Sequence, residues 1–282
     1  MLTFQGGEIP KQLLNIPDAP KTIFNIGTDI SQFMTLPRVA VVGARNMSPY
    51  GKNVTESLVE KLASDGVVIV SGLALGIDGV AHKACLKSDG TTVAVLPSGI
   101  DSIYPRSHLG LAKQIVESGG AIISEKAGKI SPKPYDFLVR NRIISGLSDA
   151  VLVTEAAARS GSLNTARHAL EQGKTIFAVP GNINSITSEG TNNLIKMGAI
   201  LVSRVEDIYS AMGWSLENAK PTPKSLNDNE RIIYEILQTG PLSGEALLAK
   251  SGLSKSTFTE SLTVLEIEDL IIPLGANNWG LK

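Results

Sequence analysis

The chain has 282 residues, a formal net charge of −1, one cysteine and 5% aromatic residues. Its 43% hydrophobic content can form a sizeable core, which excludes wholesale disorder. The longest apolar runs fall far short of the ~20 residues that span a bilayer, and the N-terminus lacks the basic start and apolar run of a signal peptide. One cysteine and three histidines offer neither an internal disulfide nor a metal-ligand cluster. The composition therefore predicts a cytoplasmic protein without a metal, another cofactor or a membrane span.

The net charge is an average over two unlike segments. Residues 1–214 carry 20 Lys and Arg against 18 Asp and Glu, whereas residues 215–282 carry 6 against 9. Within the first segment, residues 126–142 hold five basic side chains, one acidic side chain and the aromatic residues Tyr135 and Phe137. An aromatic ring among cations is typical of single-strand binding, because bases stack on the ring and phosphates bind the cations. A solvated basic surface loop stays open as the alternative.

The first part of the chain predicts a large α/β domain. Residues 1–37 contain four prolines and little periodicity, so we expect an irregular N-terminal lead-in. Over residues 38–214, continuous apolar runs alternate with helical patterns, as in parallel strands covered on both faces. The expected strands are 39–42, 67–70, 92–96, 121–124, 150–154, 175–179 and 200–202, and the expected helices are 50–64, 76–87, 107–117, 163–171 and 189–196. This alternation predicts an extended Rossmann-like, doubly wound parallel sheet.

The last part predicts a small C-terminal winged-helix domain. Residues 215–227 are the expected linker, since they contain two prolines and no apolar period. Over 228–282 we expect three helices and two short strands, at 228–238, 243–250, 254–269, 270–273 and 278–281. Ser243 and either Ser254 or Ser256 are the expected N-caps. The third helix carries one basic and four acidic side chains, which favours protein contact or regulation over DNA binding, although DNA binding stays open.

Ligands of an open parallel sheet bind at the carboxyl ends of its strands, so the residues just after each strand matter most. Neither a G-x-G-x-x-G run nor a P-loop follows a strand here. Small residues that present backbone N–H groups instead predict an anion nest, and its expected members are Gly43, Ser71, Gly72 and Gly76. Plain turn glycines remain the alternative.

Three titratable residues near these strand ends have less specific interpretations. Asp78 is a candidate N-cap of the following helix, and His82 is interpreted as a packing histidine rather than a catalyst. Glu155 follows the fifth expected strand and is the candidate for a general base. Without a second catalytic group nearby, we expect Glu155 to pair with Arg142 or Arg159.

Two further segments carry the main binding hypothesis. If residues 137–147 are helical, Phe137, Arg140 and Asn141 share one face at i, i+3 and i+4, although Phe137 can also be a core residue. Residues 160–162 predict a small anion nest, with Ser162 capping the next helix. We expect no catalytic residue. The candidate nucleic-acid-binding residues are Arg45, Arg106, Lys133, Phe137, Arg140, Asn141, Arg142, Ser160, Gly161, Ser162 and Lys174.

Together these motifs resemble the DNA-processing protein A (DprA, also called Smf) family. The resemblance covers residues 9–282, and its most specific parts are RNRIISGLS at 140–148 and SGSLNTA at 160–166. It implies a recombination mediator that binds single-stranded DNA and works as a homodimer. Such a protein protects incoming DNA during the natural transformation of competent cells and loads the RecA recombinase onto it. It also implies that Arg45, Arg106 and Phe137 contact DNA. Ala44 and Leu138 depart from the serine and proline usual in the family.

Two enzymatic functions are the alternatives to this hypothesis. Phosphoribohydrolases of a similar fold carry a Pro-Gly-Gly-x-Gly-Thr-x-x-Glu signature, which is absent here, and a hydrolase would have to use Glu155. A dinucleotide-dependent enzyme would need G-x-G-x-x-G and an acidic residue after the second strand, and the chain has neither. The sequence therefore predicts a non-catalytic protein, with a nucleotide hydrolase as the alternative.

Overall fold

The computed structural model describes residues 2–214, 226–238, 240–268, 270–275 and 277–281. The chain separates into two units, Met1–Ser215 and Leu216–Lys282. Most of the expected linker, 215–227, lies outside the described residues. In the described ranges, no helix combines the length and the apolar character needed to cross a bilayer.

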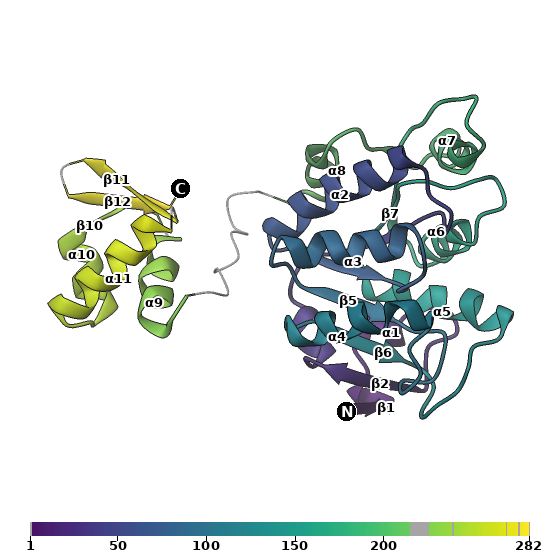
Figure 1. The fold of residues 1–282 in the computed structure, drawn as a ribbon, viewed down its shortest axis with the longest axis horizontal. Coiled ribbons are helices and arrows are strands. Elements are labelled where there is room, and N and C mark those ends of the chain that lie inside the picture. The colour runs from purple at the N-terminus through teal and green to yellow at the C-terminus, as the bar shows by residue number, and fades with distance from the viewer. Residues whose placement is uncertain (1, 215–225, 239, 269, 276, 282) are drawn as a thin grey trace. The chain divides into compact units, whose positions relative to one another are not determined.

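A nine-stranded sheet forms the centre of the first unit, in the order β1-β2-β6-β5-β4-β3-β7-β8-β9 (Figure 1). The parallel strands are β3 (Arg38–Val42), β4 (Val68–Ser71), β5 (Thr92–Val95), β6 (Ala121–Ser124), β7 (Ala150–Val153), β8 (Thr175–Ala178) and β9 (Ile200–Leu201). Each corresponds to an expected strand, with ends shifted by one residue at most. The strand order reverses between β3 and β7, which is the arrangement of a doubly wound sheet.

The N-terminal residues are not the irregular lead-in that the sequence predicted. They form β1 (Leu2–Gln5), the short helix α1 (Lys11–Leu14) and β2 (Thr22–Gly27). β2 pairs antiparallel with β6, and β1 pairs antiparallel with β2, so both strands extend the sheet. Along β2 only every second side chain, Ile23 and Asn25, is buried. This strand has no continuous apolar run to mark it in the sequence, because the burial of its side chains alternates.

Helices cover both faces of the sheet. One face carries α1, α5 (Pro134–Leu147), α6 (Ser162–Glu171) and α7 (Glu189–Lys196). The other carries α2 (Pro49–Ser64), α3 (Ile77–Lys87), α4 (Leu109–Glu117) and α8 (Val205–Met212), as Figure 1 shows for α2, α3 and α8. The sidedness follows from the strands, since Ala40 and Val42 face the first set and Val39 and Val41 face the second.

The second unit is a winged helix. Its helices α9 (Asp228–Leu237), α10 (Gly244–Ser251) and α11 (Lys255–Ile267) accompany a three-stranded antiparallel sheet with the order β10-β12-β11. The strands are β10 (Leu242–Ser243), which the sequence did not predict, β11 (Ile271–Gly275) and β12 (Asn278–Leu281). The hydroxyl of Ser243 accepts from Ala246 N–H, and that of Ser254 from Thr257 N–H. Ser254, rather than Ser256, is therefore the N-cap of α11.

Candidate nucleic-acid interface

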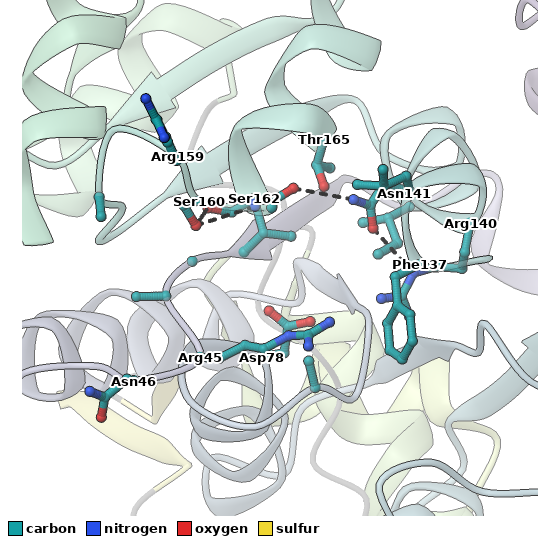
Figure 2. A pocket seen from close by; sticks show the side chains of 18 of the residues that line it. Arg45, Asn46, Asp78, Phe137, Arg140, Asn141, Arg159, Ser160, Ser162 and Thr165 are labelled. Carbon is teal, nitrogen blue, oxygen red and sulfur yellow. Dashed lines mark hydrogen bonds between the residues drawn. The ribbon is translucent and has the colours of Figure 1, made fainter. Parts of the chain in front are cut away.

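The loops that leave β3 and β7 border a cavity of about 870 Å³ at the carboxyl edge of the sheet (Figure 2). This is the point at which the strand order reverses, where open α/β sheets bind ligands. The β3–α2 loop, the first turn of α3, helix α5 and the β7–α6 loop contribute to its lining. Three arginines and one aspartate are among the lining residues, so the cavity is net positive.

Most of the residues expected to bind nucleic acid line this cavity. They are Arg45, Phe137, Arg140, Asn141, Ser160, Gly161 and Ser162. Polar and aromatic lining residues absent from that expectation are Asn46, Asp78, Tyr104, Arg159, Thr165 and Thr187. The sequence could have indicated two of these as binding residues. Arg159 directly precedes the predicted nest, and Tyr104 is an aromatic residue in the segment after a strand.

Arg45 and Phe137 contact each other within the cavity. The guanidinium Cζ of Arg45 lies 4.7 Å from the centroid of the Phe137 ring, and Figure 2 shows the two side chains from the β3–α2 loop and α5 approaching one another. Tyr104 packs its ring edge-to-face against Phe137, with centroids 5.5 Å apart. Cation–π contacts of this kind contribute about 0.5–1 kcal/mol at exposed sites. Phe137 is half-buried, and together with Tyr104 it forms an aromatic wall of the cavity. The exposed Arg45 guanidinium lies beside this wall.

Arg140 forms part of the cavity wall but is 5% exposed. Its Nη1 donates to the carbonyl oxygens of Gly72, at 2.8 Å, and of Val95. Burial lowers the pKa of Arg140 to about 10, and the nearby charge of Asp78 opposes this shift. Burial likewise raises the pKa of Asp78, opposed most strongly by Arg140. Arg140 thus supplies positive charge from a fixed position, balanced in part by Asp78.

Asp78 is not the cap of α3 that the sequence predicted. Gly76 holds the N-cap position, and Asp78 lies in the first turn. The Asp78 carboxylate accepts a hydrogen bond from Gly72 N–H at 3.1 Å. Its side chain therefore links the loop after β4 to α3.

The loop before α6 presents small polar groups to the cavity. Gly161 is the N-cap of α6 and Ser162 is its first residue, so the predicted cap shifts by one position. The hydroxyls of Ser160 and Ser162 are 2.7 Å apart, and Asn141 Nδ2 donates to Gly161 O at 3.3 Å. The exposed Arg159 precedes these serines. A helix N-terminus with adjacent hydroxyls and a cation favours an anion.

Two predicted binding residues lie away from the cavity, and their contact with DNA stays a prediction. Arg142 is 6% exposed and binds Asp18 (3.1 Å) and Glu125 (2.7 Å). It stands two positions after Arg140 on α5, so the two side chains leave the helix on different sides. Lys174 precedes β8, at the amino end of a strand, whereas the cavity lies at the carboxyl ends. Partial burial lowers its pKa.

Arg106 and Lys133 lie beside cavity-lining residues without lining the cavity themselves. Arg106 is exposed, in the short 3-10 turn that follows Tyr104 and Pro105. Lys133 is exposed between Pro132 and Pro134, which both line the cavity. Contact of these two cations with a bound strand stays a prediction.

In the anion nest expected after β3 and β4, two polar groups have partners within the protein. The Ser71 hydroxyl donates to Val41 O at 2.6 Å, and Gly72 N–H donates to Asp78. Gly76, with φ +80°, packs against the carbonyl oxygens of the β3–α2 loop, and a side chain at Gly43 would overlap Ile77. These glycines allow close approach of chain segments. Within the described part of the chain, Gly43 alone of the four lines the cavity.

The two remaining titratable candidates have internal roles. His82 is fully buried, its Nδ1 lies 2.7 Å from Thr92 Oγ1, and burial lowers its pKa to about 3, which agrees with a packing histidine. Glu155 does not form the expected pair with Arg142 or Arg159. Its carboxylate instead accepts a hydrogen bond from Ser48 N–H at 2.8 Å.

Comparison with known proteins identifies the family. The family model of DNA recombination-mediator protein A matches residues 1–213, and that of the DprA winged helix domain matches residues 217–277. The chain belongs to the DNA recombination-mediator protein A family. Among the similar DprA proteins, Protein Smf of Escherichia coli is 48% identical over 216 residues, which cover 77% of this chain and 57% of that protein. DprA of Bacillus subtilis is 40% identical over 205 residues, or 73% of this chain and 68% of that protein.

Solved DprA structures share the fold. DprA from Streptococcus pneumoniae has a TM-score of 0.69 and 39% identity, covering 74% of this chain and 73% of that chain. DprA from Helicobacter pylori, described by its single-stranded DNA binding mode, has a TM-score of 0.67 and 33% identity, covering 75% and 96%. The present chain thus spans little more than half the length of the Escherichia coli relative.

Proposed function

We propose that this chain is a non-catalytic recombination mediator that binds single-stranded DNA in the cavity between the β3 and β7 loops. The observation that carries the proposal is the Arg45 guanidinium held 4.7 Å over the Phe137 ring in a net positive cavity. The same cavity holds the N-terminus of α6. A family relative, DprA of Helicobacter pylori, has a single-stranded DNA binding mode, which supports this function.

The strand would bind through its backbone and through stacking. Arg45, Arg159 and the N-terminus of α6 would hold phosphates, and a base would stack against the Arg45–Phe137 pair. Arg140 would add charge from the cavity wall while keeping its bonds to backbone carbonyls. Stacking and phosphate contacts read no base edges, so this mode tolerates any sequence.

The assignment of a non-catalytic role rests on how the carboxylates are used. A nucleotide hydrolase needs a carboxylate that water and substrate can reach, and Glu155 is the candidate for that base. The Glu155 carboxylate is 2% exposed: its Oε2 accepts from Ser48 N–H, and its Oε1 is buried without a hydrogen-bond partner among the described residues. The Asp78 carboxylate binds Gly72 N–H beside Arg140. Both groups therefore support the binding function over the hydrolase.

We further propose that the protein works as a homodimer in the cytoplasm, protects incoming strands and loads RecA onto them during natural transformation. An apolar groove of about 760 Å³ beside the edge strand β9 supports a second copy as partner. Its lining includes Leu170, Met197 and Ile200, which are 70%, 76% and 39% exposed. Light scattering should give a dimer mass for the chain and a monomer mass for Met197→Glu, with Leu109→Glu on α4 as the control. A dimer mass for Met197→Glu would contradict this surface.

A fluorescence-anisotropy titration with an oligo-dT probe tests the binding function. The double variant Arg45→Ala/Phe137→Ala should lose binding while its circular dichroism and unfolding temperature stay close to those of the parent. Arg204→Ala removes an exposed arginine away from the cavity and should bind as the parent does. Unchanged affinity of the double variant would refute the proposed site.

A further inference from the structure

Glu155 binds the loop that carries Arg45 on both sides of that residue. The main-chain oxygen of Glu155 accepts a hydrogen bond from Ala44 N–H at 2.8 Å. Its carboxylate Oε2 accepts one from Ser48 N–H, also at 2.8 Å. One residue at the carboxyl end of β7 thus holds the β3–α2 loop before and after the cation.

The position of this carboxylate is fixed by packing. Glu155 is 2% exposed, and a methyl group added at Gly51 would overlap its carboxylate. Ser48 is the N-cap of α2, and its hydroxyl accepts from Gly51 N–H at 3.1 Å. The carboxylate therefore lies against the first turn of a 16-residue helix, where exposed N–H groups favour negative charge.

We propose that Glu155 is a positioning residue that sets the place of the Arg45 guanidinium in the single-strand site, without touching DNA itself. The inference rests on the proposed function, because it needs Arg45 to contact the strand. Arg45 is exposed, and Phe137 holds only its guanidinium end. The Glu155 side chain supplies the hydrogen bond to Ser48 N–H, so its loss loosens the loop next to Arg45 and makes ordering it a cost of binding.

The structure offers a matched control at the other end of the same strand pair. Asp149 lies just before β7, whereas Glu155 lies just after it. The Asp149 Oδ2 accepts a hydrogen bond from Arg38 N–H at 2.9 Å, at the start of β3. Arg38 also pairs through Nη2 with Asp149 Oδ1 and donates to the carbonyl oxygens of Phe33, Leu36 and Leu147, three bonds that do not involve Asp149. Asp149→Ala should therefore weaken the β3–β7 region without reaching the Arg45 loop.

The test measures oligo-dT affinity of the full chain by anisotropy at several salt concentrations, well below the unfolding temperature. Glu155→Ala should weaken binding about 10- to 100-fold, comparable to loss of the Arg45 contact, and should lower the slope of log K against log salt by about 1. In an Arg45→Ala background, Glu155→Ala should have little further effect. Glu155→Gln keeps an oxygen for Ser48 N–H and should bind within about threefold of the parent.

The controls separate positioning from general destabilisation. Asp149→Ala should keep the parent's affinity and salt slope even with a lower unfolding temperature. If Glu155→Ala does not fold, Glu155→Asp replaces it, and we expect weaker binding together with faster hydrogen exchange at the Ser48 amide. The inference would be overturned if a Glu155 variant with faster hydrogen exchange at the Ser48 amide kept the parent's oligo-dT affinity. It would also be overturned if the effects of Glu155→Ala and Arg45→Ala on the binding free energy were additive. If Arg45→Ala itself binds normally, the proposed function fails instead.

Discussion

Replacement of Arg140 by methionine distinguishes a structural cation from an exposed phosphate ligand. Arg140 is 5% exposed, donates to the carbonyl oxygens of Gly72 and Val95, and is near enough to the buried Asp78 for their charges to interact. The variant leaves two carbonyls short of a donor and a buried carboxylate without its main opposite charge. Breaking a buried charge pair in this way costs about 3–5 kcal/mol of unfolding free energy. An exposed phosphate ligand would cost less than about 0.5 kcal/mol.

The sign of the pH dependence provides a second readout of the same variant. Burial already raises the pKa of Asp78, and loss of Arg140 raises it further. A folded-state pKa above the unfolded value means that stability is greatest at low pH and falls as pH rises through the folded pKa. The free-energy loss of Arg140→Met should therefore be larger at a pH where the folded Asp78 is ionised than at a pH where it is protonated. Adding Asp78→Asn removes the unpaired charge and should recover about 1–3 kcal/mol.

Urea unfolding monitored by tryptophan fluorescence measures this directly. The two units each contain one tryptophan, Trp214 and Trp279, so a Trp279→Phe background reports on the first unit alone. Trp214 packs against the core that includes α2 and α8. A stability loss below about 0.5 kcal/mol, an equal loss at both pH values, or no recovery with Asp78→Asn would refute the structural role of Arg140.

Three other residues give compact tests. Burial lowers the pKa of His82 to about 3, so between pH 7.5 and pH 5 only the unfolded chain protonates this histidine. The unfolding free energy should therefore fall by about 2 kcal/mol over that range. An equal fall in His82→Gln would contradict this. Lys174→Ala should leave oligo-dT affinity and its salt slope unchanged in an anisotropy titration, since Lys174 lies away from the cavity; a tenfold loss would restore it to the site. Tyr104→Ala should weaken oligo-dT binding about 2- to 10-fold by removing the edge-to-face support of Phe137, and parental affinity would show that this contact is irrelevant to binding.

The parallel core of the fold could be predicted because its strands are covered on both faces. Continuous apolar runs such as Ala121–Ser124 need no partner information to be recognised. The strand Thr22–Gly27 could not be found in this way, since only its alternate side chains are buried and it follows a proline-containing segment. Its place in the sheet depends on pairing with β6, a contact between residues about a hundred positions apart.

The sequence could predict which residues lie at the site when sheet topology places them there. It could not predict which of those residues are buried. Arg45 and Ser160 come just after strands, so the carboxyl-edge rule brings them together. The position of Arg142 away from the cavity could have been predicted, because helical periodicity separates it from Arg140. The burial of Arg140 had no sequence signal: it depends on Gly72, where any side chain would overlap the guanidinium.

The most direct test of the account compares single-stranded and duplex DNA of one length in anisotropy titrations at two salt concentrations. A cavity that stacks a base against Arg45 and Phe137 needs unpaired bases, so the account predicts tighter binding of the single strand. Phosphate contacts predict that this affinity falls steeply with salt. Tighter binding of the duplex, or single-strand binding that salt does not change, would contradict it.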